Sequence, residues 1–171
     1  FMPTLLRSWG IADVFTIGLL AAIPAVVGMI GMVLVGRSSD THMERRRHFL
    51  FCVALAAGGL LLTVLTKGNM VLGLIGLSIM AIGQSANTPI FFAAVSEYLP
   101  KKSAAGGIAL ISSLGNLGPA AMPVLMTWIS TRTGSSDSGM YITMALWMLA
   151  GMLLMTVVRQ SGAVAPRLAT A

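Results

Sequence analysis

Seven residues that lie within two long apolar runs could bind a small polar molecule: Gln84, Asn87, Thr88, Phe91, Ser112, Ser113 and Asn116. The first four are spaced 0, 3, 4 and 7 along the chain and the last three 0, 1 and 4, so each set lies largely on one face of a helix. Their amides and hydroxyls can donate hydrogen bonds to a carboxylate or a sugar hydroxyl, and the phenyl ring could supply an apolar wall. We take all seven as candidate substrate contacts.

The composition places these residues in a membrane protein. Hydrophobic residues make up 56% of the 171 residues, charged residues make up 9%, and the mean hydropathy is +0.88. A soluble domain carries roughly 25% charged residues, because its surface must be hydrated. The net charge of +6 does not indicate nucleic-acid binding, because the basic residues fall between the apolar runs rather than along one basic face.

Five apolar stretches are long enough to cross a bilayer as helices, and none contains Asp, Glu, Lys, Arg or His. They are the ranges 16–35, 49–66, 70–95, 104–130 and 139–158. These runs are apolar on every face, which argues against the alternating strands of a β-barrel. We predict an all-α polytopic membrane bundle over residues 1–158, with the end of an earlier helix at 1–6 and a tail at 159–171. Ala54 and Gly58 form a small-xxx-small pair, which predicts a helix contact there.

The basic residues predict the orientation of the bundle. One side would collect eight of the eleven Lys and Arg residues: Arg37, Arg45, Arg46, Arg47, Lys101, Lys102, Arg159 and Arg167. The other side would hold Arg7, Lys67 and Arg132. We therefore expect the richer side, with the carboxyl-terminal tail, to be cytoplasmic. The expected location is the inner (plasma) membrane.

A charged turn, GRSSDTHMERRRH from Gly36 to His48, joins the first two predicted spans. Asp40 would end a helix at the cytoplasmic face and could pair with Arg45 or Arg46, or accept from a neighbouring helix N-terminus. Such contacts can form in one conformation and break in another, which biases a two-state equilibrium. The alternative is a solvated positive turn without a gating role. The candidate gating residues are Gly36, Asp40, Glu44, Arg45 and Arg46.

This turn resembles the loop signature of the major facilitator superfamily, which is a Gly, three residues, an Asp and a basic cluster. It is more similar still to the form found in the anion:cation symporter family. Seven positions agree with that form: Gly36, Ser39, Asp40, Glu44, Arg45, Arg46 and His48. Two positions depart from it. Thr41 stands where the family usually has a basic residue, and Met43 stands where it often has a glycine.

A second block, Ala104 to Ile129, is similar to the eleventh helix of that family. The agreement covers Gly107 to Leu110 and Ser113, and continues from Gly115 to Gly118. Ser112 replaces the usual Asn, and Pro119 stands in a Gly position. The resemblance extends over essentially the whole chain, and it implies the carboxyl half of a twelve-helix transporter, from the end of helix seven to helix twelve.

The resemblance also implies a function: proton-coupled uptake of a small organic anion by alternating access of two helix bundles. A sugar acid, tartrate or an aromatic carboxylate would be a typical substrate. Proton coupling needs a group that titrates within the membrane, and no predicted span contains a carboxylate. We therefore expect the proton relay, and a basic residue that pairs with the anion, in a missing amino-terminal half of the same chain.

Other interpretations stay open. A major facilitator of another family could carry a neutral substrate or a drug, and a standalone membrane subunit could act as a non-transporting scaffold. The polar residues in the spans could instead be hydrogen-bonding glue between helices. We expect no enzyme, because the sequence has no His and carboxylate cluster, no activated serine motif and no phosphate loop. With one cysteine, Cys52, we also expect no cysteine metal site, and we predict no cofactor.

Overall fold

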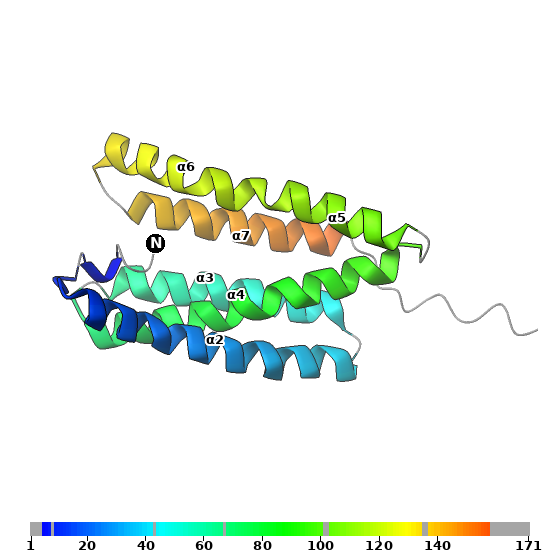
Figure 1. Ribbon diagram of the computed structural model, residues 1–171, viewed down its shortest axis with the longest axis horizontal. Helices are drawn as coiled ribbons and strands as arrows, with labels where there is room; N and C mark the ends of the chain where they lie inside the picture. The colour runs from blue at the N-terminus through cyan, green and yellow to red at the C-terminus, as the bar shows by residue number, and fades with distance from the viewer. Residues whose placement is uncertain are drawn as a thin grey trace, which may run out of the picture.

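The computed structural model describes residues 5–7, 9–42, 44–66, 68–100, 103–134 and 137–157. All regular structure in these ranges is helical, which confirms the predicted all-α class. The helices are α2 (Val14–His42), α3 (Arg45–Leu65), α4 (Met70–Tyr98), α5 (Ala104–Gly115), α6 (Leu117–Thr133) and α7 (Asp137–Val157), as Figure 1 shows. Residues 5–7 are also helical, whereas residues 1–4 and the predicted tail at 159–171 lie outside the described residues.

Within the described part of the chain, five helical stretches are long and apolar enough to cross a membrane, with α5 and α6 counted together as one. The helices extend beyond the predicted apolar runs, most of all at the charged turn, where α2 continues to His42 and α3 begins at Arg45. Asp40 lies in the last turn of α2, which ends at His42, so the helix ends just after the predicted residue. The charged side chains of this extra turn can reach water beyond the hydrocarbon core, so nothing forces the helix to stop.

Glycines bring the backbones of α3 and α4 into direct contact. A Cβ atom placed on Gly59 of α3 would lie 2.5 Å from the carbonyl oxygen of Gly76 on α4. One placed on Gly83 of α4 would lie 2.6 Å from the backbone nitrogen of Ala56 on α3. Close approach of this kind increases the van der Waals contact between helices. That contact is a main source of attraction where lipid competes for apolar surface.

A second face of α4 packs against α2 in the same way. A Cβ atom on Gly28 would lie 2.9 Å from Oγ of Ser85, and one on Gly31 would lie 2.6 Å from a side chain of α4. The described helices do not make the predicted contact at Ala54 and Gly58, because both residues are exposed and a Cβ on Gly58 would meet no described atom within 4 Å. Small-residue spacing indicates that a helix can pack closely, but not which of its faces does so.

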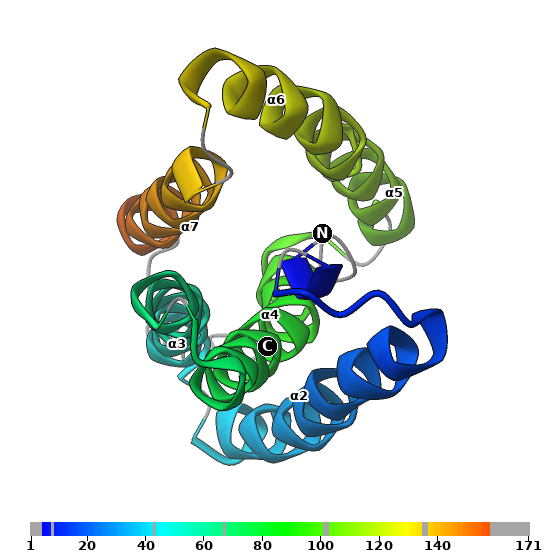
Figure 2. The ribbon, with the colours of Figure 1, turned by 90° about the vertical axis from the view of Figure 1, so that its left-hand side faces the viewer.

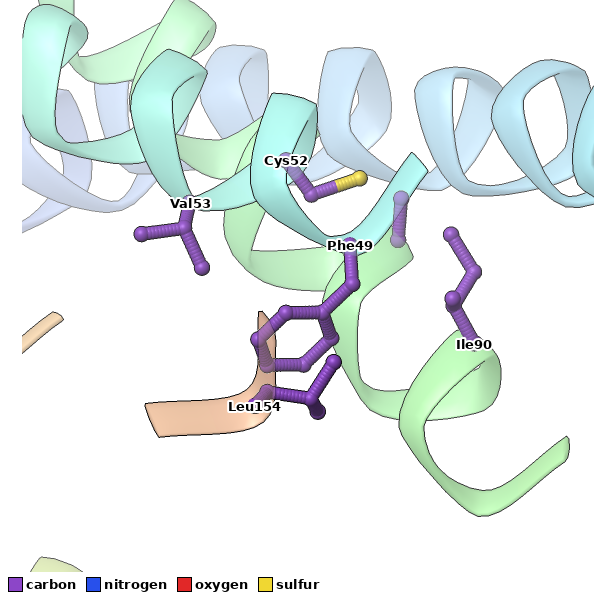
Figure 3. Packing of buried hydrophobic residues seen from close by; sticks show 6 residues of the cluster. Phe49, Cys52, Val53, Ile90 and Leu154 are labelled. Carbon is purple, nitrogen blue, oxygen red and sulfur yellow. The ribbon is translucent and has the colours of Figure 1, made fainter. Parts of the chain in front are cut away.

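Apolar side chains join α3 to both α4 and α7. One buried cluster contains residues of all three helices: Phe49, Cys52, Val53, Ala86, Ile90 and Leu154 (Figure 3). A second buried cluster joins α3 and α7 nearer the other end: Leu60, Val64, Met140 and Met144. Viewed along the bundle, α3 lies next to both α4 and α7 (Figure 2).

The helices α5 and α6 form one membrane-length stretch that is interrupted at Asn116. Pro119 has no N–H group, so it cannot donate to the carbonyl of Gly115, the last residue of α5. The most apolar part of this stretch contains no buried residue. It contacts α7, and its start meets the end of α4 where Gly107 lies against Leu99. The remainder curves away from α4 (Figure 2).

Polar residues fix several helix ends. The Asp13 carboxylate accepts hydrogen bonds from the backbone nitrogen of Thr16 at 2.8 Å and from its hydroxyl at 2.6 Å, which starts α2. These two bonds hold the pKa of the exposed Asp13 carboxyl below its usual value. Asn69 caps α4 by accepting from the nitrogens of the second and third following residues. Gly134, with a φ of +68°, ends α6 in the left-handed conformation that glycine adopts without strain.

The two adjacent glycines of α3 provide a test of the backbone contact. Gly59→Ala places a methyl group against the α4 backbone, and overpacking of this kind costs about 1–3 kcal/mol. Gly58→Ala places the same group in open space, where the higher helix propensity of Ala makes it neutral or slightly stabilising. We expect Gly59→Ala to lower the thermal unfolding midpoint of the detergent-purified protein and Gly58→Ala to leave it unchanged. Equal midpoints would contradict the contact.

Candidate functional site

The predicted substrate residues of α4 divide into an open pair and a packed pair. Gln84, the central residue of this 29-residue helix, and Thr88, one turn later, are both exposed. Asn87 and Phe91 are half-buried instead. The ring of Phe91 lies 6.2 Å from that of Phe49 on α3, and Asn87 follows one turn after a glycine that contacts α3. The four residues predicted to share one face of the helix therefore divide between a side that packs against α3 and a side that is open.

The amide of Asn87 has an unusual environment for a membrane-spanning helix. Its side-chain oxygen is buried and accepts no hydrogen bond from any residue that the structure describes. Leaving a buried acceptor unpaired costs about 1–3 kcal/mol. Because its side-chain oxygen is buried, Asn87 belongs to the boundary with α3. The exposed residues Gln84 and Thr88 belong to the open surface of α4.

The predicted residues of the fourth span lie at or just before the bend between α5 and α6. Ser113 and Asn116 are exposed, and Ser112 is half-buried. The hydroxyl of Ser113 donates to the carbonyl of Ala109 at 2.8 Å, a bond within its own helix. Asn116 is the residue at the interruption, where its backbone N–H still reaches the carbonyl of Ser112 at 3.0 Å. Its side chain therefore stands where the helix changes direction.

The structure does not bring these two polar stripes into contact. Among the described residues, no Cα atom of α6 lies within 8 Å of one in α4, and α5 approaches α4 only at a few positions. Figure 2 shows α6 beside α7 and away from α4. Gln84 and Asn116 therefore do not belong to one packed contact between the described helices.

An exposed amide in the middle of an apolar helix is unfavourable against lipid. Transfer of an unpaired amide from water to an apolar medium costs roughly 2–7 kcal/mol, depending on the reference state. Polar residues of membrane helices accordingly face a bundle interior or a water-filled cavity. We expect the side of α4 that carries Gln84, and the bend that carries Asn116, to face water, a solute or another protein surface.

A charged network links three helices at the other candidate site. Arg45, the first residue of α3, forms an ion pair with Asp40 of α2 and a second one, 3.2 Å long, with Glu97 of α4. Its guanidinium also donates to the hydroxyl of Ser39 at 3.2 Å, and that serine is completely buried. The side chain of Arg45 is 15% exposed, whereas those of Asp40 and Glu97 are 68% and 35% exposed. One arginine thus ties the ends of α2, α3 and α4 together.

The other predicted gating residues have separate partners. Arg46 donates from Nη2 to the carbonyl of Met155 in the last turn of α7, so Asp40 pairs with Arg45 and not with Arg46. Glu44 pairs with Arg47 at 2.9 Å. A Cβ atom on Gly36 would meet none of the residues that the structure describes within 4 Å, so packing against them does not explain the glycine there.

Sequence reasoning missed Glu97 as the third member of the network. It lies 52 residues from Arg45 along the chain, so no local spacing connects them. The available signal was its position, since Glu97 is the acidic residue at the expected cytoplasmic end of the third span. Of the His, Cys, Asp and Glu side chains in the described residues, no three come together in a way that could hold a metal ion.

The chain matches the family model of the Major Facilitator Superfamily over residues 1–170. It is 33% identical over 156 residues to the "Putative metabolite transport protein NicT" of Pseudomonas putida, covering 91% of this chain and 34% of that protein. It is 31% identical to a "Putative tartrate transporter" of Agrobacterium vitis, with coverage of 93% and 35%. It is 32% identical to the "Quinolone resistance transporter" of Acinetobacter baumannii, with coverage of 92% and 36%.

These similarities cover only part of each relative. The chain spans about a third of the length of the curated relatives it matches, between 34% and 36% for the three just described. No solved structure matches the chain. The relatives are named as transporters, and the five membrane-length helices make this chain part of a multi-pass membrane protein.

Proposed function

Because the chain belongs to the major facilitator superfamily, we propose that it is the carboxyl-terminal half of a secondary active transporter of the anion:cation symporter type. The transporter takes up a small organic anion together with a proton by alternating access. Its described spans are helices eight to twelve, and the amino-terminal half of the same polypeptide completes it. The bundle lies in the inner (plasma) membrane with its carboxyl terminus in the cytoplasm.

The observation that carries this proposal is the exposed polar surface at the centre of α4. Gln84 and Thr88 are open there, although the surrounding span is apolar enough to cross a membrane. Secondary transporters bind their substrates near the bilayer midplane, between two related halves. A second helix bundle facing this surface would remove it from lipid and form a site in which an amide and a hydroxyl donate to a carboxylate.

The positions of the charges support a division of labour between the two halves. The five acidic residues of the chain all lie at helix ends or in turns: Asp13, Asp40, Glu44, Glu97 and Asp137. A proton carried across the membrane needs a titratable group at depth, and an anion needs a positive partner there. Both groups then belong to the amino-terminal half, while this half supplies neutral donors.

The names of the relatives bear on the substrate class. The tartrate transporter favours a carboxylate substrate for this chain. The quinolone resistance transporter is similar to about the same extent, and it favours a second candidate function, the transport of drugs.

Uptake into proteoliposomes tests the proposal. The full-length protein should take up labelled tartrate or an aromatic carboxylate several-fold faster when the outside is more acidic, because proton entry drives the anion inward. A protonophore should remove this acceleration, and protein-free liposomes provide the control. Transport of a quinolone with no carboxylate uptake would replace the proposal with the second candidate. Transport of neither would refute both.

Gln84 provides a test of the substrate surface. We expect Gln84→Ala to raise the KM for the transported anion about tenfold, which corresponds to about 1.4 kcal/mol of lost hydrogen bonding, with kcat nearly unchanged. Ser85→Ala is the matched control, because Ser85 contacts Gly28 of α2 instead of the open side. An equal effect of the two substitutions would mean that Gln84 contributes to packing and does not contact the substrate.

The network around Arg45 supports the gating role proposed for this loop. Arg45 begins α3, and its side-chain partners lie on two other helices. Asp40 and Ser39 lie on α2, and Glu97 lies on α4. Movement of one helix end relative to the others breaks some of these bonds. The network therefore favours the conformation in which all of them form.

A double-mutant cycle tests this role. We expect Asp40→Asn and Glu97→Gln each to slow uptake about threefold to tenfold, while the protein still reaches the membrane. Combining them should add little, because both act through Arg45. Glu44→Gln, which removes only the partner of Arg47, should leave the rate unchanged. Fully multiplicative effects of Asp40→Asn and Glu97→Gln, measured per inserted protein, would remove the shared gating role.

A further inference from the structure

A groove between α2 and α3 lies beside the charged network of Arg45 and contains none of the residues of that network. Its volume is about 370 Å³, and its lining comes from the end of α2 and the beginning of α3: Leu34, Val35, Ser38, Arg47, His48 and Phe51. The two helices make few contacts with each other, because each packs mainly on α4. Their ends consequently leave an open space that faces outward from the bundle.

One end of the groove is polar, and hydrogen bonds hold its side chains in place. His48 binds the carbonyl of Glu44 through Nδ1 at 2.9 Å, so Nδ1 carries the proton, and Nε2 lies 3.0 Å from the hydroxyl of Ser38. Arg47 donates to Glu44 from Nη1 alone. Its other guanidinium nitrogens form no bond to a described residue, so they are available to a further acceptor.

The other end of the groove is apolar and continues along the outer surface. Leu34 and Phe51 are 62% and 55% exposed, and Ile30, one turn from Leu34, is 54% exposed. Leu34 and Val35 are the last residues of the first apolar run, and His48 directly precedes the second run. The groove therefore crosses the level at which hydrocarbon gives way to charged residues.

We propose that this groove binds the headgroup of an anionic phospholipid of the inner leaflet, with an acyl chain along Leu34 and Phe51. Arg47 donates to the phosphate, and Ser38 holds the neighbouring His48 ring in place by donating to Nε2. The surrounding segment from Gly36 to His48 has four arginines against two acidic residues. Basic pockets between helices on the cytoplasmic side of a membrane are suited to such headgroups.

A phospholipid satisfies both ends of the groove, and other occupants do not. A soluble peptide would have to enter the hydrocarbon to reach Phe51, and a transmembrane helix would place apolar side chains against the donors of Arg47. The inference rests on the proposed orientation, which puts this loop at the inner leaflet. Lipid retention can be measured without transport, so its failure is distinguishable from failure of the proposed transport function.

The test uses the full-length protein exchanged into vesicles of phosphatidylcholine and phosphatidylglycerol and then analysed by native mass spectrometry. We expect retained phosphatidylglycerol in the wild type and at least a fivefold loss in Arg47→Gln, with a smaller loss in Ser38→Ala. Arg37→Gln is the matched control, because it removes the same charge from an exposed position on α2 outside the groove. It should retain phosphatidylglycerol within twofold of the wild type.

Four results would overturn the proposal. The first is unchanged retention in both Arg47→Gln and Ser38→Ala. The second is an equal loss in Arg37→Gln, which would indicate diffuse surface charge. The third is thermal stabilisation by free glycerol phosphate equal to that by phosphatidylglycerol, which would indicate a site for soluble phosphates. The fourth is a co-purifying protein whose removal exposes the groove.

Discussion

The rest of the structure depends on the backbone contact between α3 and α4. In a membrane the apolar surface of a helix gains little by leaving lipid, so helices associate where their backbones can approach closely. Gly59, Gly76 and Gly83 permit this approach on the α3 side of α4, and Gly28 and Gly31 permit it on the α2 side. With α4 held from two sides, the direction in which Gln84 points is fixed by this close packing of small residues.

This packing also explains why the polar residues of α4 divide as they do. The side of α4 that carries Gly83 must face α3, and Asn87 lies one turn further along that side. Gln84 and Thr88 lie outside both contact surfaces and remain open. The fourth span is held differently, because it meets α7 and the end of α4 and has no buried residue in its apolar part. Under the proposed function, its exposed face is the surface that a second helix bundle would cover.

Much of the fold follows from hydropathy alone, because a membrane span has to be long and apolar whatever its neighbours are. The helix contacts do not follow from hydropathy. The residue spacing predicted a contact at Gly58, whereas the structure has the contact at its neighbour Gly59. Both are small, and only the position of α4 distinguishes them. The same limit applies to the sites. The pairing of Asp40 with Arg45 is local and could be anticipated, whereas Glu97 joins the network only through the packing of α4 against α3.

The strength of the Arg45 network is consistent with a switch. Its carboxylates are partly exposed, and ion pairs of this kind contribute about 0–1 kcal/mol each, because water competes for both partners. A fully buried pair would be costly to break, since each separated charge would lose its solvation. Breaking contacts at the water interface returns the charges to solvent, so two helix arrangements can differ by only a few kcal/mol. The bond from Arg46 to α7 involves a different helix, so α3 and α7 can remain joined while the ends of α2 and α4 separate.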